Sequence, residues 1–201
     1  MADADRAGHL RHLYDTAWEM LAPGFHPYDE VVESLTEMVT WDDDSPLGPD
    51  DVDAAVRSLW ARRQAELAVR PPRVPTDDVR LSDAFAELTR RGIIASINLG
   101  GDQDDGSHLS RELAAGQPGT RGYAFCHEQD INRLAYPDPV LYIAFDAVGA
   151  FADPPAYDEA ARVVGAEIVT ALTVYGLITA WTGSPTARIQ VTDLVWRRPL
   201  P

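Results

Sequence analysis

Residues 93–128, IIASINLGGDQDDGSHLSRELAAGQPGTRGYAFCHE, decide the fold of this chain. Two short apolar segments typical of strands, 93–99 and 121–128, flank a glycine-rich loop and a helical stretch that contains Leu109 and Leu113. A helix between two strands favours a parallel crossover, because parallel neighbours need a long connection. Both strands would then end at the same edge of a sheet.

The residues around this unit continue the alternation of helices and strands. A helix from Thr76 or Asp77 is expected to end at Gly92, a favoured C-terminal residue, and a long helix is expected near 155–175. Further strands are expected at 140–146, 177–182 and 188–196. The last two are joined by the tight segment GSPTA, so they form an antiparallel hairpin or are near neighbours. The fold class expected for residues 76–201 is therefore α+β, a five-stranded mixed sheet with packed helices.

The N-terminal third has a different pattern. Apolar residues recur at helical spacing in three segments, 3–21, 28–40 and 49–67. The proline-rich stretch VRPPRVP, residues 69–75, ends the third segment and is the best linker candidate. We therefore expect a helical N-terminal region, residues 1–70, that precedes the α+β core domain.

Charge is distributed unevenly along the chain. All 17 basic residues are arginine, and residues 1–56 hold 14 acidic side chains but only Arg6 and Arg11 as cations. A region this negative repels nucleic acid and anionic membranes, so neither is an expected partner. The charge serves solubility, or it forms a docking surface for a basic protein partner, and the sequence leaves both interpretations open.

Several other classes of protein are disfavoured. No apolar run reaches the ~18 residues that a membrane span needs, and the N-terminus lacks the features of a signal peptide, so a cytoplasmic protein is expected. A single cysteine, Cys126, excludes an internal disulfide and a multi-cysteine zinc site. Neither a phosphate-binding loop nor a dinucleotide fingerprint occurs, so no cofactor is expected.

The segment GYAFCHEQD, residues 122–130, ends a strand with reactive side chains. Strand alternation places His127 on the face of Tyr123 and Phe125. In a structural interpretation, His127 donates to a backbone carbonyl and Asp130 caps the following turn. In a functional one, His127 is a general base or a ligand whose tautomer Asp130 fixes.

The loop GGDQDDG, residues 100–106, is acidic and flexible. Its spacing fails the EF-hand pattern, because Gly106 follows Asp105 one residue too early. Asp102, Asp104 and Asp105 remain weak metal-ligand candidates, and Asp105 or Ser107 is expected to cap the next helix.

If the two strands of the opening segment are parallel, their polar ends converge at one rim. The candidates there are Asn98, Gln103, Asp105, His127, Gln129 and Asp130. Convergence would place a histidine among carboxylates and amides, and the neighbouring negative charge would raise its pKa. Trp181, beside a glycine turn, and Arg188 are expected to line the same cleft.

Four short motifs in a fixed order resemble one bacterial, largely actinobacterial family, the domain of unknown function 6891 family. The matching residues are Thr76, Asp77, Arg80 and Leu81; Asn98, Gly100, Asp105 and Gly106; His127, Gln129 and Asp130; and Trp181, Gly183, Arg188 and Ile189. The similarity covers residues 74–198 well. Gly101 and Thr182 depart from the aromatic and the acid expected there, which would alter a pocket wall. The resemblance implies the fold and these positions, and it brings no activity with it.

Two classes of function follow from these residues. The first is a non-enzymatic binding or regulatory protein that uses the acidic helices or the sheet face. The second is a small hydrolase-like or metal-dependent enzyme that uses His127, Asp130 and the 100–106 loop. The absence of a serine-nucleophile or other recognisable catalytic motif favours binding.

Overall fold

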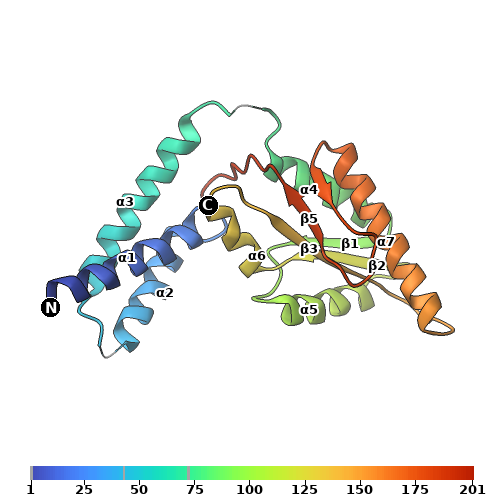
Figure 1. Cartoon of the computed structure of the whole chain (residues 1–201), viewed down its shortest axis with the longest axis horizontal. Coiled ribbons are helices and arrows are strands. Elements are labelled where there is room, and N and C mark those ends of the chain that lie inside the picture. Colours follow the sequence, from blue (N-terminus) through green and yellow to red (C-terminus); the bar gives the residue numbers. More distant parts are fainter. Residues whose placement is uncertain (1, 43, 72) are drawn as a thin grey trace. The chain divides into compact units, whose positions relative to one another are not determined.

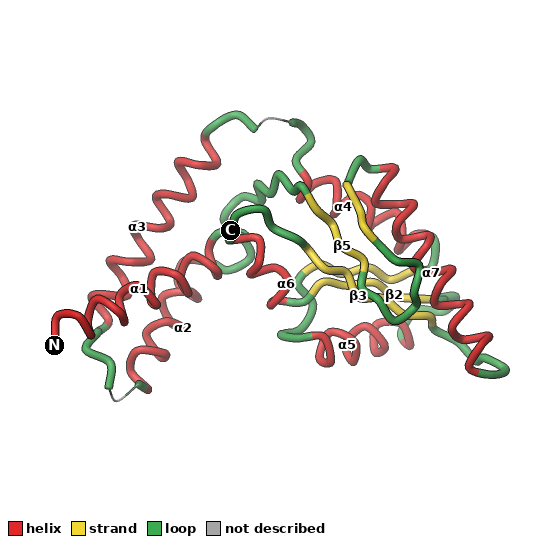
Figure 2. Tube along the Cα trace, viewed as in Figure 1, coloured by secondary structure: helices red, strands yellow, loops and turns green. Residues whose placement is uncertain are grey.

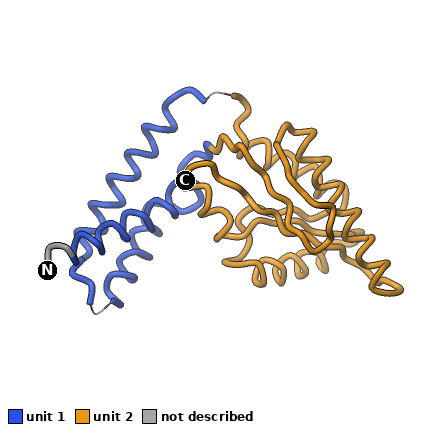
Figure 3. The backbone as a smooth tube through the Cα atoms, viewed as in Figure 1, with its two compact units in different colours: residues 1–72, 197–201 blue, residues 73–196 orange. Residues whose placement is uncertain are grey.

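In a computed structural model, which describes residues 2–42, 44–71 and 73–201, the chain forms two compact units (Figures 1 and 3). One comprises residues 1–72 and 197–201, and the other residues 73–196. Asp43 and Pro72, which fall in two of the predicted breaks between elements, lie outside the described residues. None of the described helices has the length and apolar character to cross a membrane.

The first unit contains three helices, α1 (Ala2–Leu21), α2 (Tyr28–Trp41) and α3 (Pro49–Ala68). Pro49 occupies the first helical position of α3, and the amide of Gly48 donates to Asp51 Oδ2 at 3.0 Å. The apolar stripes predicted from the sequence form one shared core. Its buried members are Leu13, Ala17, Leu21, Val31, Leu35, Val39, Val52, Ala55, Val56 and Leu59.

The C-terminal residues pack against these helices. The Arg197 guanidinium donates to the carbonyl of Val69 at 2.6 Å, and Arg198 Nε donates to the carbonyl of Gly24 at 3.0 Å. Gly24 has φ +77, and a Cβ there would lie 2.8 Å from the carbonyl oxygen of Pro199. Glycine is therefore required at this close approach.

The second unit confirms the α+β prediction. Its elements are α4 (Asp77–Arg90), β1 (Ile93–Ile97), α5 (Gln103–Ala115), β2 (Gly122–Cys126), α6 (Glu128–Asn132), a 3-10 turn (Arg133–Ala135), β3 (Leu141–Ala147), α7 (Pro154–Val174), β4 (Ile178–Ala180) and β5 (Ile189–Thr192). The strands form one mixed sheet in the order β1-β2-β3-β5-β4 (Figure 2). β1 and β2 are parallel, and the other neighbours are antiparallel, including the predicted β4–β5 pair.

Helices cover both faces of the sheet at β1 and β2. On one face, α5 packs against Tyr123 and Phe125 of β2. On the other face, α7 approaches so closely that a Cβ on Gly122 would lie 2.8 Å from Val164. α7 buries Val164, Ile168 and Leu172 in this layer, as the helical spacing predicted.

The strands are shorter than the sequence suggested. β2 ends at Cys126 rather than at residue 128, because His127 becomes the N-cap residue of α6. β5 ends at Thr192, and Asp193 then adopts φ +54, a left-handed conformation that breaks the strand. Apolar alternation beyond these points comes from buried loop residues rather than from strand.

Candidate functional site

The parallel pairing of β1 and β2 brings their C-terminal ends to one edge of the sheet. The loop after β1 is hydrogen-bonded to the chain that leaves β2. The amide of Leu99 donates to the carbonyl of Cys126 at 3.1 Å, and the amide of Glu128 donates to the carbonyl of Gly100 at 3.0 Å. The loop and the start of α6 therefore lie side by side.

The acidic side chains of this loop hold its own backbone. Asp102 is the N-cap of α5, and its Oδ1 accepts from the amides of Asp104 and Asp105 at 2.9 and 3.0 Å. The cap was predicted at Asp105 or Ser107, but α5 begins at Gln103, so only Asp102 has the extended conformation of a cap. Asp105 Oδ2 instead accepts from the amide of Gly101 at 2.9 Å.

These hydrogen bonds bear on the metal-ligand candidates. Two of the three carboxylates, Asp102 and Asp105, are already satisfied by backbone donors. Across the part of the chain that the structure describes, no three His, Cys, Asp or Glu side chains are grouped to hold a metal ion.

A buried cluster of charged and polar side chains lies at the start of α6, around Asp130. This side chain is 0% exposed, and His127 is 4% exposed. His127 Nε2 lies 2.9 Å from Asp130 Oδ2, and Arg188 Nη1 donates to both Asp130 oxygens at 3.1 Å. Arg133 Nη1 is 3.9 Å from Asp130 Oδ1. A buried carboxylate is thus surrounded by one histidine and two arginines.

Burial and charge act in opposite directions on this cluster. Burial raises the pKa of Asp130, and the positive charges of Arg188 and Arg133 oppose the rise, together with His127. Burial also lowers the pKa of His127, so the rise predicted from its carboxylate neighbours is wrong: desolvation outweighs the negative charge of Asp130. From the lowered pKa and the 2.9 Å contact with Asp130 Oδ2, we infer that His127 is neutral and carries its proton on Nε2. The 3.4 Å approach of Arg188 Nη1 to His127 Nε2 then joins two donors and is not a hydrogen bond.

This tautomer leaves His127 Nδ1 as an acceptor. Nδ1 is buried and has no hydrogen-bond partner among the described residues. A buried polar atom without a partner destabilises a folded protein by about 1–3 kcal/mol. The imidazole therefore orients Asp130 at some cost in stability.

The lowered pKa of His127 predicts that the protein loses stability in acid. Below about pH 6.5, His127 binds a proton in the unfolded state but stays unprotonated in the folded state, so the free energy of unfolding falls as the pH falls. Above that pH, His127 is neutral in both states and has no such effect. The raised pKa of Asp130 has the opposite slope, because the folded state keeps its proton as pH rises past about 4.

Urea unfolding at pH 5.0, 6.0 and 7.5 measures this slope. His127→Gln should remove the fall in stability between the upper and middle pH values, whereas His108→Gln, at an exposed position on α5, should leave it unchanged. Equal slopes in the His127→Gln variant and the unsubstituted protein would contradict the assignment of a neutral, buried His127.

A pocket of about 280 Å³ lies beside Arg188. It is lined by Tyr142, Ala180, Trp181, Thr182, Ala187, Arg188 and Gln190. Cross-strand pairing places Tyr142 opposite Gln190 and Gln190 opposite Ala180, so these three side chains share one face of the sheet. We call this the open face, because Ala180 and Ile178, which lie on it, are exposed.

Trp181 is held firmly in the wall of this pocket. Its Nε1 donates to the carbonyls of Ser184 and Ala187 at 3.1 and 3.0 Å, which closes the turn between β4 and β5. Its ring meets Phe145 edge to face, with centroids 5.7 Å apart. A Cβ on Gly165 of α7 would lie 2.7 Å from this indole. The indole therefore has little freedom to move.

The structure places the eight predicted site residues in three groups. His127, Asp130 and Arg188 are in contact, and Trp181 shares a pocket with Arg188. Asn98 lies in the adjacent loop with φ +59, and Asp105 lies in the first turn of α5. Gln103 and Gln129 are exposed at the starts of α5 and α6.

Sequence reasoning missed three residues of this site. Arg133 follows Asp130 by one helical turn, a spacing that indicates an ion pair. Tyr142 and Gln190 are polar-tipped residues within apolar strands, and only the strand register shows that they face each other. The guanidinium carbons of Arg188 and Arg133 lie 4.6 and 5.2 Å from the centroid of the Tyr142 ring.

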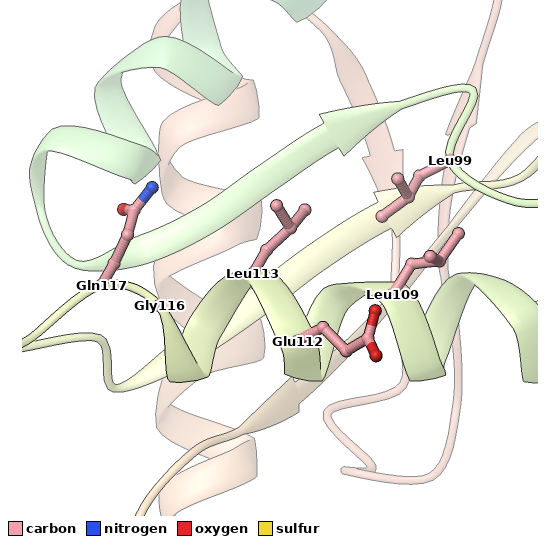
Figure 4. Close-up of a pocket in the computed structure, with 6 residues that line it drawn as sticks. All are labelled: Leu99, Leu109, Glu112, Leu113, Gly116 and Gln117. Carbon is pink, nitrogen blue, oxygen red and sulfur yellow. The ribbon is translucent and has the colours of Figure 1, made fainter.

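A larger hollow of about 440 Å³ lies elsewhere, along α5 (Figure 4). Leu109 and Leu113 of α5 and Leu99 of the preceding loop form its apolar wall, and Leu113 is 43% exposed. Glu112, Gly116 and Gln117 complete the lining. Size favours this hollow, but it lacks the buried charges that surround Arg188, so we place the candidate site at the smaller pocket.

Comparison with known proteins identifies the family. A family model described as a domain of unknown function (DUF6891) matches residues 6–200. The chain therefore belongs to this family, and the match extends well beyond the residues 74–198 that the sequence motifs covered. No curated protein and no solved structure matches the chain.

Proposed function

We propose that this family member is a non-enzymatic binding protein that takes a small molecule in the pocket on the open face of its sheet. The proposal places binding in the α+β core domain, residues 76–201. One observation carries it: Arg188, partly exposed in the pocket wall, is held by a carboxylate that is completely buried. Holding a cation in place before the ligand arrives lowers the entropic cost of binding.

The composition of the pocket supports this proposal. Small-molecule sites combine apolar and aromatic walls with a few fixed polar groups. Here Tyr142 supplies aromatic surface and Trp181 borders the pocket, while Arg188, Gln190 and Thr182 supply donors and acceptors. The volume of about 280 Å³ lies just below the usual range for ligand pockets, roughly 300–1,000 Å³, so the ligand is small.

A blocked pocket tests the proposal. A mixture of small charged and neutral fragments is expected to shift the backbone amide NMR signals of Gln190 and Thr182 in the unsubstituted protein. Ala180→Trp places a large side chain in the pocket and should abolish these shifts. Ala150→Trp, at an exposed position before α7, is the matched control and should retain them. Shifts that persist in Ala180→Trp would place binding elsewhere.

The second candidate is a hydrolase-like or metal-dependent enzyme that uses His127, Asp130 and the 100–106 loop. It is favoured by the 2.9 Å contact of His127 Nε2 with Asp130 Oδ2, because a general base needs a second group that fixes its tautomer. Against it, the free nitrogen Nδ1 is buried, and Asp102 and Asp105 are bound to backbone amides. Thermal unfolding with calcium, zinc or manganese added tests the metal-dependent form of this candidate, since a protein that binds the metal in its folded state is stabilised by it.

The acidic N-terminal helices lead to a separate prediction about a protein partner. Asp29, Glu33 and Glu37 are exposed along α2, four residues apart, and belong to the region of high negative charge. Any protein that docks there is expected to be basic and to dissociate as salt rises, because the Debye length falls from ~10 Å at 0.1 M to ~3 Å at 1 M salt. Pull-down at low and high salt measures this.

A triple variant provides the control for this prediction. Replacing Asp29 by Asn, and Glu33 and Glu37 by Gln, keeps the shape of α2 and removes three negative charges. Binding that survives both this change and high salt would show that the partner does not recognise the acidic surface through charge.

A further inference from the structure

The hydrogen bonds of Arg188 leave one edge of its guanidinium available. Nη1 is committed to Asp130 at 3.1 Å from both oxygens. Among the residues that the structure describes, Nε and Nη2 have no hydrogen-bond partner. These two nitrogens form the side edge of the guanidinium, where two N–H bonds run parallel. That edge matches the two oxygens of a carboxylate.

The guanidinium is also held in one orientation. Asp130, completely buried, anchors one end, and the Tyr142 ring lies 4.6 Å from the guanidinium carbon. Gln190 and Tyr142 face each other across β3 and β5 on the same face. Arg188 precedes β5 directly, so the sheet itself fixes the position of its backbone.

Electrostatics restricts the charge of the ligand. With His127 neutral, the cluster holds two arginine charges and one carboxylate, a net charge of one positive unit. A single negative charge neutralises it. A dianionic phosphate would bring a second negative charge toward Asp130, and repulsion between like charges a few Å apart is strong where water is excluded.

The other residues that line the pocket indicate the chemistry of the part of the ligand that does not contact Arg188. Ala180 adds apolar surface on the open face, and Trp181 borders the pocket while its indole ring packs against Phe145 and Gly165 on the α7 side of the sheet. Gln190 and Thr182 provide an amide and a hydroxyl at the margin. The wall suits a ring or short branched chain rather than a highly polar body.

We propose that the ligand is a small monocarboxylate with an aromatic or branched apolar body, and that its carboxylate binds the Nε and Nη2 edge of Arg188. This inference rests on the proposed function, since it assigns a chemical class to the ligand of the same pocket.

Three matched probes test the class: benzoate, benzyl alcohol and phenyl phosphate. Titration followed by backbone amide NMR is expected to show saturable shifts at Ala180 and Gln190 with benzoate. Benzyl alcohol, which has the same ring without the charge, and phenyl phosphate should each bind at least tenfold more weakly.

Substitution at the guanidinium tests the contact. Arg188→Lys keeps a cation beside buried Asp130, so the variant retains the ion pair, but it lacks the two-nitrogen edge. Its affinity for benzoate should fall at least tenfold. Arg162→Lys, at an exposed arginine of α7 that pairs with Glu159, is the matched control and should bind as the unsubstituted protein does.

The outcomes separate this inference from the proposed function. Benzyl alcohol binding as tightly as benzoate, or phenyl phosphate binding more tightly, would overturn the carboxylate while leaving a small-molecule pocket in place. Unchanged benzoate affinity in Arg188→Lys would also overturn it. If none of the three probes shifts the NMR signals of the pocket amides, the carboxylate inference is wrong. The experiment with the fragment mixture and the Ala180→Trp variant then tests separately whether the pocket binds any small molecule.

Discussion

Asp130→Ala should lower the free energy of unfolding of residues 73–196 by about 3–5 kcal/mol, the usual loss when one partner of a buried ion pair is removed. The carboxylate is 0% exposed and accepts from Arg188 Nη1 through both oxygens. Without it, Arg188 is left beside an apolar cavity, and His127 Nε2 loses its acceptor. Binding in the pocket should fall as well, because Arg188 would no longer be held.

Urea unfolding measured on the NMR signals of β2 and β3 isolates this effect, because the chain has two compact units and an average signal can mix two transitions. Asp158→Ala, at an exposed position on α7, is the control and should change the free energy by less than about 0.5 kcal/mol.

A second substitution identifies the cause of the loss. If an unpaired charge causes it, Arg188→Met in the Asp130→Ala background should restore part of the stability, since the double variant has no uncompensated cation. Additive losses would instead show that the two residues stabilise the fold independently, and the account of a coupled pair would be wrong.

The architecture of the α+β unit was predictable because its signals are local. The helix between the first two strands favoured a parallel crossover, and β1 and β2 are parallel. The short GSPTA segment leaves β4 and β5 no arrangement other than antiparallel. In each case a connection of known length decides how the strands pair. The resemblance to the family implied the same fold, and the match of the family model over residues 6–200 confirms that the chain belongs to this family.

The candidate site was predictable only in part. His127 and Asp130 are three residues apart, so their pairing could be proposed from the sequence. The contact between Asp130 and Arg188 joins positions 58 residues apart. It depends on the register of β3 against β5, and nothing local in the sequence fixes that register.

The acidic loop shows a different limit of sequence reading. Its carboxylates could be counted, but their roles depend on where α5 begins. Because α5 starts at Gln103, Asp102 is the N-cap residue, and the Asp105 carboxylate accepts a hydrogen bond from the amide of Gly101. Helix starts read from sequence are uncertain by a residue or two, which is enough to exchange these roles.

Ile168→Ala should lower the free energy of unfolding of residues 73–196 by about 2–5 kcal/mol, the cost of removing three buried carbons and leaving a cavity. Ile168 is 0% exposed and lies at the middle of α7, between Val164 and Leu172 in the buried stripe. α7 packs on β2, β3 and α4, so this cavity would open at the centre of the layer rather than at its margin, where neighbours could close it.

Val163→Ala on the same helix provides the matched control, because it also shortens a β-branched side chain. Val163 is 40% exposed, so it leaves little cavity, and alanine favours helix, so the change in stability should stay within about 0.5 kcal/mol. Both variants are compared by urea unfolding on the NMR signals of β2 and β3. Two results would contradict this prediction: a loss below about 1 kcal/mol for Ile168→Ala, or equal losses for the two variants. Either result would mean that helix propensity rather than burial explains the contribution of α7 to stability. The layered α+β core inferred from the apolar spacing of α7 would then be wrong.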